Sequence, residues 1–199
     1  MARARHVTLT ARVALAALVA ASGAAAQPAS YTLDPAHSFV HFEVLHFDTS
    51  TLRGRFGPLA GSVTLDRAAG QGEVGLRIPL ATVNTGVPFL DTRLRGAEFL
   101  DVVAQPDAFF VATRFRFEAG QPAELRGEFT LRGIGQALSL RALRFACRTE
   151  EQRAEVCGGD FEGELLRSDF GITFGLPFIA DRVRLQVQVE GRRELGRQP

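Results

Sequence analysis

The segment from Tyr31 to Phe56 has a small or apolar residue at every second position of its first half. Successive side chains of a β-strand point to opposite faces, so alternate residues share one side. One strand cannot bury such a face alone, and the segment therefore requires a sheet around it. The residues expected on its inner face are Ser38, Val40, Phe42, Val44 and His46.

The same period of two recurs along the chain. Such alternation is typical of antiparallel strands with one solvent-facing side, and turn residues such as Gly158-Gly159 separate the strands. About eight strands without an internal repeat or linker predict an all-β fold, a single closed antiparallel barrel, and closure removes exposed edges. The clearest further strands are 73–80, 109–117, 124–132 and 182–190.

Phe110 is ambiguous within this pattern. Regular alternation through 109–117 places Phe109 and Phe115 on one face and Phe110 on the other. A β-bulge near Thr113 would bring Phe110 and Phe115 to the same side.

One short helical insertion is expected at Leu90–Leu100. Leu90, Leu94 and Phe99 could share a helix face, and Asp91 lies near the start, where the helix dipole favours an acid. Gly96 weakens this helix.

Residues 1–26 have the pattern of a signal peptide. Arg3, Arg5 and Arg12 precede or flank a short apolar run, and Ala24–Ala26 supplies an Ala-x-Ala cleavage signal. The run is too short to span a bilayer. We therefore expect an exported, periplasmic bacterial protein whose mature domain is 27–199.

Charge and cysteine content limit the function classes. All 23 basic residues are Arg, 22 residues are acidic, and no basic stripe indicates nucleic-acid binding. Cys147 and Cys157 are the only cysteines, and in an exported chain the expectation is one structural disulfide.

The motifs of the mature chain occur in a characteristic order. The first comprises Tyr31, Leu33, Asp34, His37, Ser38, Val40, Phe42, Val44, His46, Gly54 and Phe56. Those that follow are 82–85, then Asp91, Leu94, Arg95 and Phe99, then Pro106 and Phe110, then 127–133 and 167–171. This series resembles the YceI-like family of secreted lipid-binding barrels.

The resemblance implies a lipocalin-like eight-stranded barrel that holds a long apolar ligand, such as a polyisoprenoid quinone or isoprenoid lipid. From composition alone, with 16 Phe, one Tyr and no Trp, a filled core and a hollow one are both open. The expected ligand-binding residues are Val40, Phe42, Val44, His46, Leu76, Ile78, Phe110, Phe115, Phe117, Phe129, Leu131, Leu185 and Val187.

The polar part of such a ligand has several candidate partners. His46 shares the face of the apolar residues of its strand and could hydrogen-bond a carbonyl or phosphate oxygen. An ordinary structural histidine is the alternative. Further candidates for an anionic headgroup are Arg53, Arg55, Arg93 and Arg95. For each of them, an ordinary solvated surface position is the alternative.

No enzyme motif or metal site is expected. Catalytic elbows, zinc motifs and phosphate loops are absent from the sequence, and Asp169 is interpreted as a turn or ion-pair residue. On a regular strand His37 and His41 share a face that His46 does not. A ligand-free structural protein remains the alternative to a carrier. Transient membrane contact and a dimer stay open.

Overall fold

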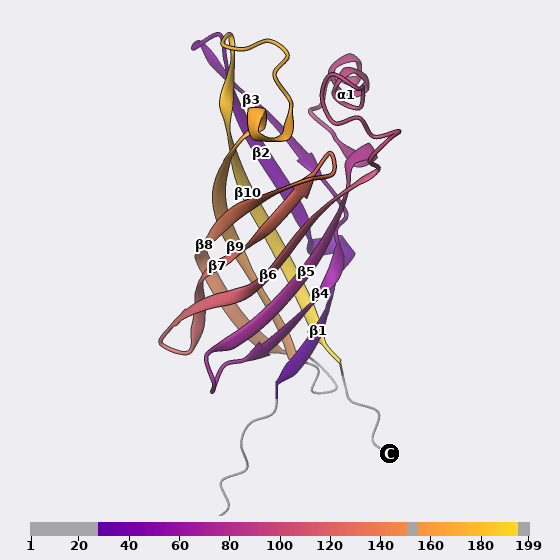
Figure 1. Cartoon of the computed structure of the whole chain (residues 1–199). Helices are drawn as coiled ribbons and strands as arrows, with labels where there is room; N and C mark the ends of the chain where they lie inside the picture. The colour runs from indigo at the N-terminus through magenta and orange to yellow at the C-terminus, as the bar shows by residue number, and fades with distance from the viewer. Residues whose placement is uncertain (1–27, 151–154, 195–199) are drawn as a thin grey trace, which may run out of the picture.

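The computed structural model describes residues 28–150 and 155–194, so the predicted signal peptide lies outside the described residues. The chain forms one antiparallel sheet rolled into a closed barrel, with one α-helix at one end (Figure 1). Among these residues, no helix is long and apolar enough to cross a membrane. The strands are β1 (Ala29–Leu33), β2 (Phe39–His46), β3 (Ser50–Phe56), β4 (Ala60–Asp66), β5 (Gln71–Pro79), β6 (Asp107–Glu118), β7 (Gln121–Leu131), β8 (Ile134–Thr149), β9 (Glu155–Leu166) and β10 (Ile179–Arg193). The helical segments are η1 (Pro35–His37), η2 (Leu80–Thr82), α1 (Pro88–Leu94) and η4 (Arg167–Phe170).

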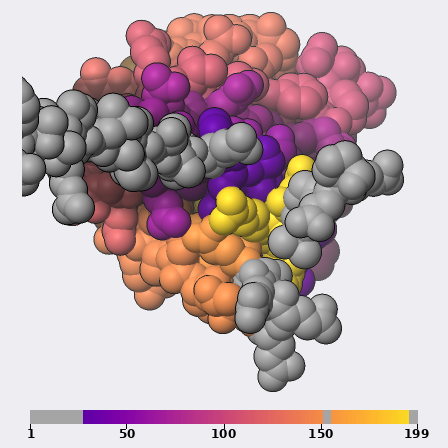
Figure 2. Space-filling model, turned by 90° about the horizontal axis from the view of Figure 1, so that it is seen from below, coloured from indigo at the N-terminus to yellow at the C-terminus, as the bar shows by residue number. Residues whose placement is uncertain are grey.

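The barrel closes because β1 pairs with both β4 and β10. Seen from one end, β1 and the end of β10 lie side by side (Figure 2). The hairpin of β2 and β3 continues along the other part of β10, where Val40 lies opposite Val187. Thus β1 and β2 act as one strand interrupted at η1, and β3 and β4 as another interrupted at Gly57-Pro58. Counted in this way, the predicted eight-stranded antiparallel barrel is confirmed.

The two ends of the barrel differ. The end carrying α1, the β2–β3 turn and the segment between η4 and β10 is uppermost in Figure 1 and is called the mouth end here. The opposite end carries the start of β1, the end of β8 and the start of β9, and is called the disulfide end.

Strand β2 follows the alternation that its sequence predicts. Ser38, Val40, Phe42 and Val44 are buried, and His46 is half-buried at the mouth end. The ring of Phe42 lies across β3 at Gly54, where an added Cβ would come within 2.4 Å of the ring. Gly54 therefore makes room for an inward aromatic side chain on the neighbouring strand.

Strand β6 contains the bulge that reconciles the two interpretations of Phe110. Its register with β7 shifts between Ala112 and Arg114. Phe110 is buried before the shift and Phe115 is partly buried after it, whereas Phe109 is exposed. The expectation that Phe109 shares the face of Phe115 is wrong, because the extra residue at the bulge reverses the alternation.

Two other predictions need correction. The helix ends at Leu94 rather than Leu100, and Phe99 is buried from the turns that follow it. Gly158 and Gly159 lie inside β9 rather than in a turn. An added Cβ on Gly158 would lie 2.6 Å from a carbonyl oxygen of β10, so close approach of strands explains this glycine.

The predicted disulfide joins β8 to β9. Cys147 and Cys157 are direct partners in the strand register, and their sulfur atoms are bonded. The polar segment between them is less of a loop than expected, because β8 continues to Thr149 and β9 begins at Glu155. The bridge thus fastens one edge of the disulfide end.

Candidate ligand-binding cavity

The mouth-end half of the barrel encloses a cavity of about 410 Å³. Pockets for small ligands occupy roughly 300–1,000 Å³, so the space is large enough for a ligand. Inward-facing side chains of most strands form its wall, and Leu90 and Leu94 of α1 contribute to it near the mouth. Of the two alternatives that composition left open, the structure has the hollow barrel.

The cavity wall contains all the predicted ligand-binding residues except Phe115 and Phe117. Phe115 lines a smaller cavity of about 60 Å³ at the disulfide end. Phe117 packs in a cluster with Tyr31, Leu65 and Cys157. Strand β6 runs from one end of the barrel to the other, so its last inward residues lie beyond the larger cavity. The predicted residues on the wall are Val40, Phe42, Val44, His46, Leu76, Ile78, Phe110, Phe129, Leu131, Leu185 and Val187.

Several wall residues were not predicted. Leu138 and Leu140 of β8 alternate with polar neighbours, and this signal was available in the sequence. Ile172 and Ile179 flank an irregular segment without periodicity, so only the tertiary structure reveals their position. Leu90 and Leu94 were predicted to share a helix face, and that face lies toward the cavity.

The polar residues of the cavity wall are few. His46, Ser50 and Thr51 come from the β2–β3 hairpin at the mouth end. The ring of His46 meets the ring of Phe47 edge-on, with centroids 4.7 Å apart. A ligand inside the barrel would therefore find hydroxyl and imidazole groups near the mouth and hydrocarbon elsewhere.

Arg167 is the only cation on this wall, and it is 5% exposed. Its guanidinium donates hydrogen bonds at 2.8–2.9 Å to four backbone carbonyl oxygens. Burial lowers the pKa of Arg167, and the nearby Asp181 carboxylate opposes this effect. The four bonds run to Ile172, Phe174, Ile179 and Ala180, so Arg167 holds the segment between η4 and β10 in place.

The four arginines considered for a headgroup lie elsewhere. Arg53 donates to a glutamate on β2, and Arg55 lies 5.0 Å from the ring centroid of an aromatic residue. Arg93 likewise lies 4.5 Å from a ring centroid, and Arg95 donates to two carbonyl oxygens near η2. None of the four is on the cavity wall.

The cavity wall does not offer a catalytic pair. His46 and Arg167 are its titratable residues, and the arginine is occupied by backbone carbonyls. Asp169, the residue interpreted as a turn or ion-pair side chain, lies exposed in η4. This arrangement suits binding of an apolar molecule better than acid–base chemistry.

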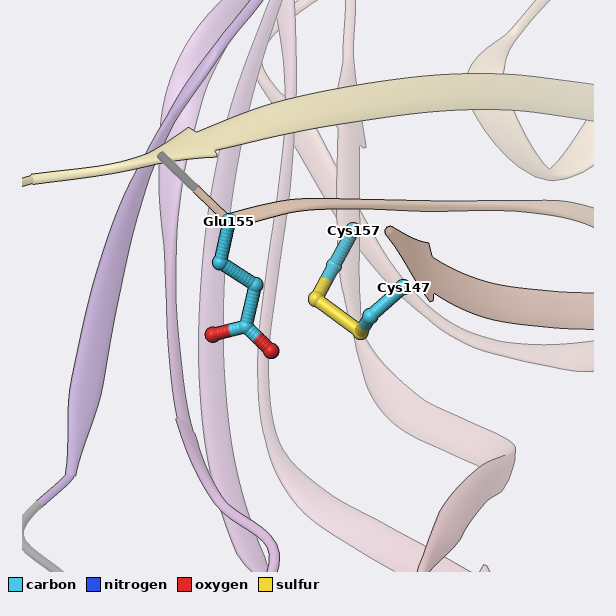
Figure 3. A group of neighbouring side chains, drawn as sticks. All are labelled: Cys147, Glu155 and Cys157. Atoms are coloured by element: carbon cyan, nitrogen blue, oxygen red, sulfur yellow. A yellow bond between two sulfur atoms is a disulfide. The ribbon is translucent and has the colours of Figure 1, made fainter. Parts of the chain in front are cut away.

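Histidines and cysteines are also separated from one another. His37 contacts Asp34 at 3.0 Å outside the barrel interior, and His46 lines the cavity. In the described residues the one close group of potential metal ligands is Cys147, Glu155 and Cys157 (Figure 3), and none of the three is on the wall of that cavity. Its two sulfur atoms are joined in the disulfide, which leaves no thiolate to bind a metal.

Comparison with known proteins gives a family assignment. The sequence profile of the YceI-like domain matches residues 31–191. Protein YceI of Salmonella newport is 32% identical over 180 residues, covering 89% of this chain and 93% of the relative.

Solved structures share the fold at lower sequence identity. The crystal structure of Burkholderia cenocepacia BcnA has a TM-score of 0.66 and 19% identity, covering 79% of this chain and 98% of that one. A polyisoprenoid binding domain from Saccharophagus degradans has a TM-score of 0.61 and 17% identity, covering 82% and 98%. From the profile match and the identity to Protein YceI, the chain belongs to the YceI-like family.

Proposed function

We propose that this protein binds one long apolar molecule, a polyisoprenoid quinone or an isoprenoid lipid, inside the barrel and acts as an exported carrier or scavenger. The observation that carries the proposal is the cavity of about 410 Å³ with an almost wholly apolar wall. The structural relative described as a polyisoprenoid binding domain supports the same ligand class.

The energetics of transfer suit a carrier. Each buried CH₂ contributes about 0.8 kcal/mol relative to water, although ordering and association offset part of the sum. A bilayer is as apolar as the cavity, so extraction of an isoprenoid chain from a membrane is nearly balanced. A protein that must both load and unload its ligand needs this balance.

Selectivity must then come from the polar end of the ligand. We place that end at the mouth, where His46, Ser50 and Thr51 contribute polar atoms to the wall. The imidazole of His46 would donate to a quinone carbonyl or phosphate oxygen. Arg167 lies on the same wall, and its charge would favour an electronegative headgroup without a direct contact.

Loading also requires contact with a membrane. Exposed apolar side chains gather at the mouth end, where Phe47 and Phe178 stack with centroids 5.5 Å apart. Phe89 on α1 is 77% exposed. We propose that these rings enter the bilayer surface during transfer, with the mouth facing the lipid. The periplasm, which the predicted signal peptide and the bacterial relatives favour, offers such surfaces on both sides.

Native mass spectrometry of the protein purified from the periplasm tests the ligand directly. We expect a bound mass that matches a quinone or isoprenoid lipid and disappears after organic extraction. An extracted barrel should take up added quinone again. An empty barrel that also fails to take up quinone would contradict the proposal and favour a ligand-free structural role.

A further inference from the structure

Two cavities share the barrel interior. The mouth-end cavity of about 410 Å³ and the disulfide-end cavity of about 60 Å³ have largely separate walls. The residues common to both walls form the partition between them, and they are Leu76, Phe110, Leu140 and Val187.

Phe110 is the largest member of this partition. It is 2% exposed and lies opposite Leu76 of β5 and Phe129 of β7 in the strand register. The partition is completed by Leu140 of β8 and Val187 of β10. The bulge after Ala112 is what allows Phe110 to point inward at this level while Phe115 points inward below it.

The space beyond the partition is apolar as well. Phe115, Leu125 and Phe161 belong to its wall but not to that of the mouth-end cavity. A hydrocarbon chain that passed the level of Phe110 would therefore meet no polar barrier. The ring itself is the main steric obstacle to a longer ligand.

We propose that Phe110 sets the length of the apolar chain that the protein accepts. This inference rests on the proposed function and narrows it. The chain enters at the mouth, and its far end stops at the Phe110 ring. A cavity of about 410 Å³ lies toward the lower end of the roughly 300–1,000 Å³ range of ligand pockets, which favours a chain of a few isoprene units.

Binding of prenols of different length tests this inference. The delipidated mature protein is titrated with farnesol, geranylgeraniol and solanesol, each competing with a fluorescent fatty-acid probe. Wild type should gain no affinity from geranylgeraniol to the much longer solanesol. Phe110→Ala should raise the preference for solanesol over geranylgeraniol by about tenfold or more, because burial of two further CH₂ groups is sufficient for that factor.

Matched variants separate this effect from general loosening. Phe115→Ala enlarges only the disulfide-end cavity and should leave the wild-type preference unchanged. Phe110→Leu is a milder opening of the partition, should shift the preference in the same direction, and serves if the alanine variant does not fold. An unchanged preference in folded Phe110 variants overturns the inference and leaves the proposed function standing. If wild type binds none of the three prenols, both are overturned.

Discussion

The mouth end and the disulfide end of the barrel are built on opposite principles. At the disulfide end, Cys147 and Cys157 are bonded, and the Glu155 carboxylate accepts hydrogen bonds from Tyr31, Arg67 and Arg193. Burial raises the pKa of the Tyr31 phenol, and its hydrogen bond to Glu155 raises it further. At the mouth end, by contrast, Phe47, Phe89 and Phe178 are exposed beside the cavity.

This difference indicates that the barrel separates stability from binding. Polar contacts and a covalent bond fix the end where the strands meet in a closed ring. The mouth end leaves apolar side chains exposed to water, which costs stability. Such exposed apolar surface is typical of a site that contacts a membrane or another apolar partner. Apart from the contacts of Arg167, changes at the mouth end should therefore mainly affect loading, and changes at the disulfide end should mainly affect unfolding.

The largest expected effect is loss of loading in Phe129→Arg. Phe129 lies on the cavity wall and packs edge-on against Phe170 at 5.6 Å. A guanidinium there would place an unpaired charge against the apolar wall of the cavity. We expect no bound lipid by native mass spectrometry. Val111→Arg, which introduces the same arginine on the exposed face of β6, should load normally. Normal loading of a folded Phe129→Arg protein would move the site outside the cavity.

Arg167 tests how much side-chain hydrogen bonds to the main chain stabilise the mouth end. Arg167→Met removes four hydrogen bonds and leaves carbonyl oxygens unpaired. We expect a loss of about 3 kcal/mol or more in the free energy of unfolding. Urea denaturation measures it. Arg182→Met, at an exposed ion pair with Glu164, should cost less than about 1 kcal/mol; equal losses would mean that the Arg167 bonds contribute little.

Removal of the disulfide should act on stability alone. The bridge spans a sequence separation of 10, and closing so short a loop contributes about 2–3 kcal/mol in the chain-entropy account. We expect this loss in denaturation of the Cys147→Ser, Cys157→Ser double variant, with quinone uptake unchanged below the transition. Reduced uptake by the folded double variant would show that the two ends are coupled.

The barrel could be predicted from the sequence because one period runs through most strands. In Val40 to His46 and in 182–190, alternation of apolar and polar residues shows which side chains face inward and which face outward. Phe110 was harder, since a bulge reverses alternation without a distinctive residue at the bulge. The position of Phe115 beyond the partition depends on how far β6 has crossed the barrel, which periodicity does not encode.

The role of Arg167 shows a second limit. In the motif at 167–171 the sequence indicated a turn or ion-pair role for Asp169 beside Arg167. The Arg167 guanidinium instead binds four main-chain oxygens of residues up to 13 positions away. Main-chain acceptors have no sequence signature, because every residue carries one. Contacts of this type appear only when the chain path is known.

The smallest effect concerns α1, on the mouth rim. The Asp91 carboxylate accepts hydrogen bonds from the hydroxyl and N–H of Thr85, both at 2.7 Å. The hydroxyl bond is the main cause that lowers the pKa of Asp91, against the opposing effect of burial. Its stabilisation is therefore complete above the ordinary aspartate pKa of about 4 and is lost as the pH falls through the lowered value.

Hydrogen exchange of residues 84–95, corrected for intrinsic rates, should show this local loosening on acidification. Asp91→Asn should abolish the pH dependence of protection in α1, because the amide does not titrate in this range. Asp101 lies in the turns after α1, and its carboxylate does not take part in the contacts between Asp91 and Thr85. Asp101→Asn should therefore retain the pH dependence of protection in α1. If α1 loosens equally on acidification in the Asp91 variant, another group controls the rim, and the mouth does not depend on the contacts between Asp91 and Thr85.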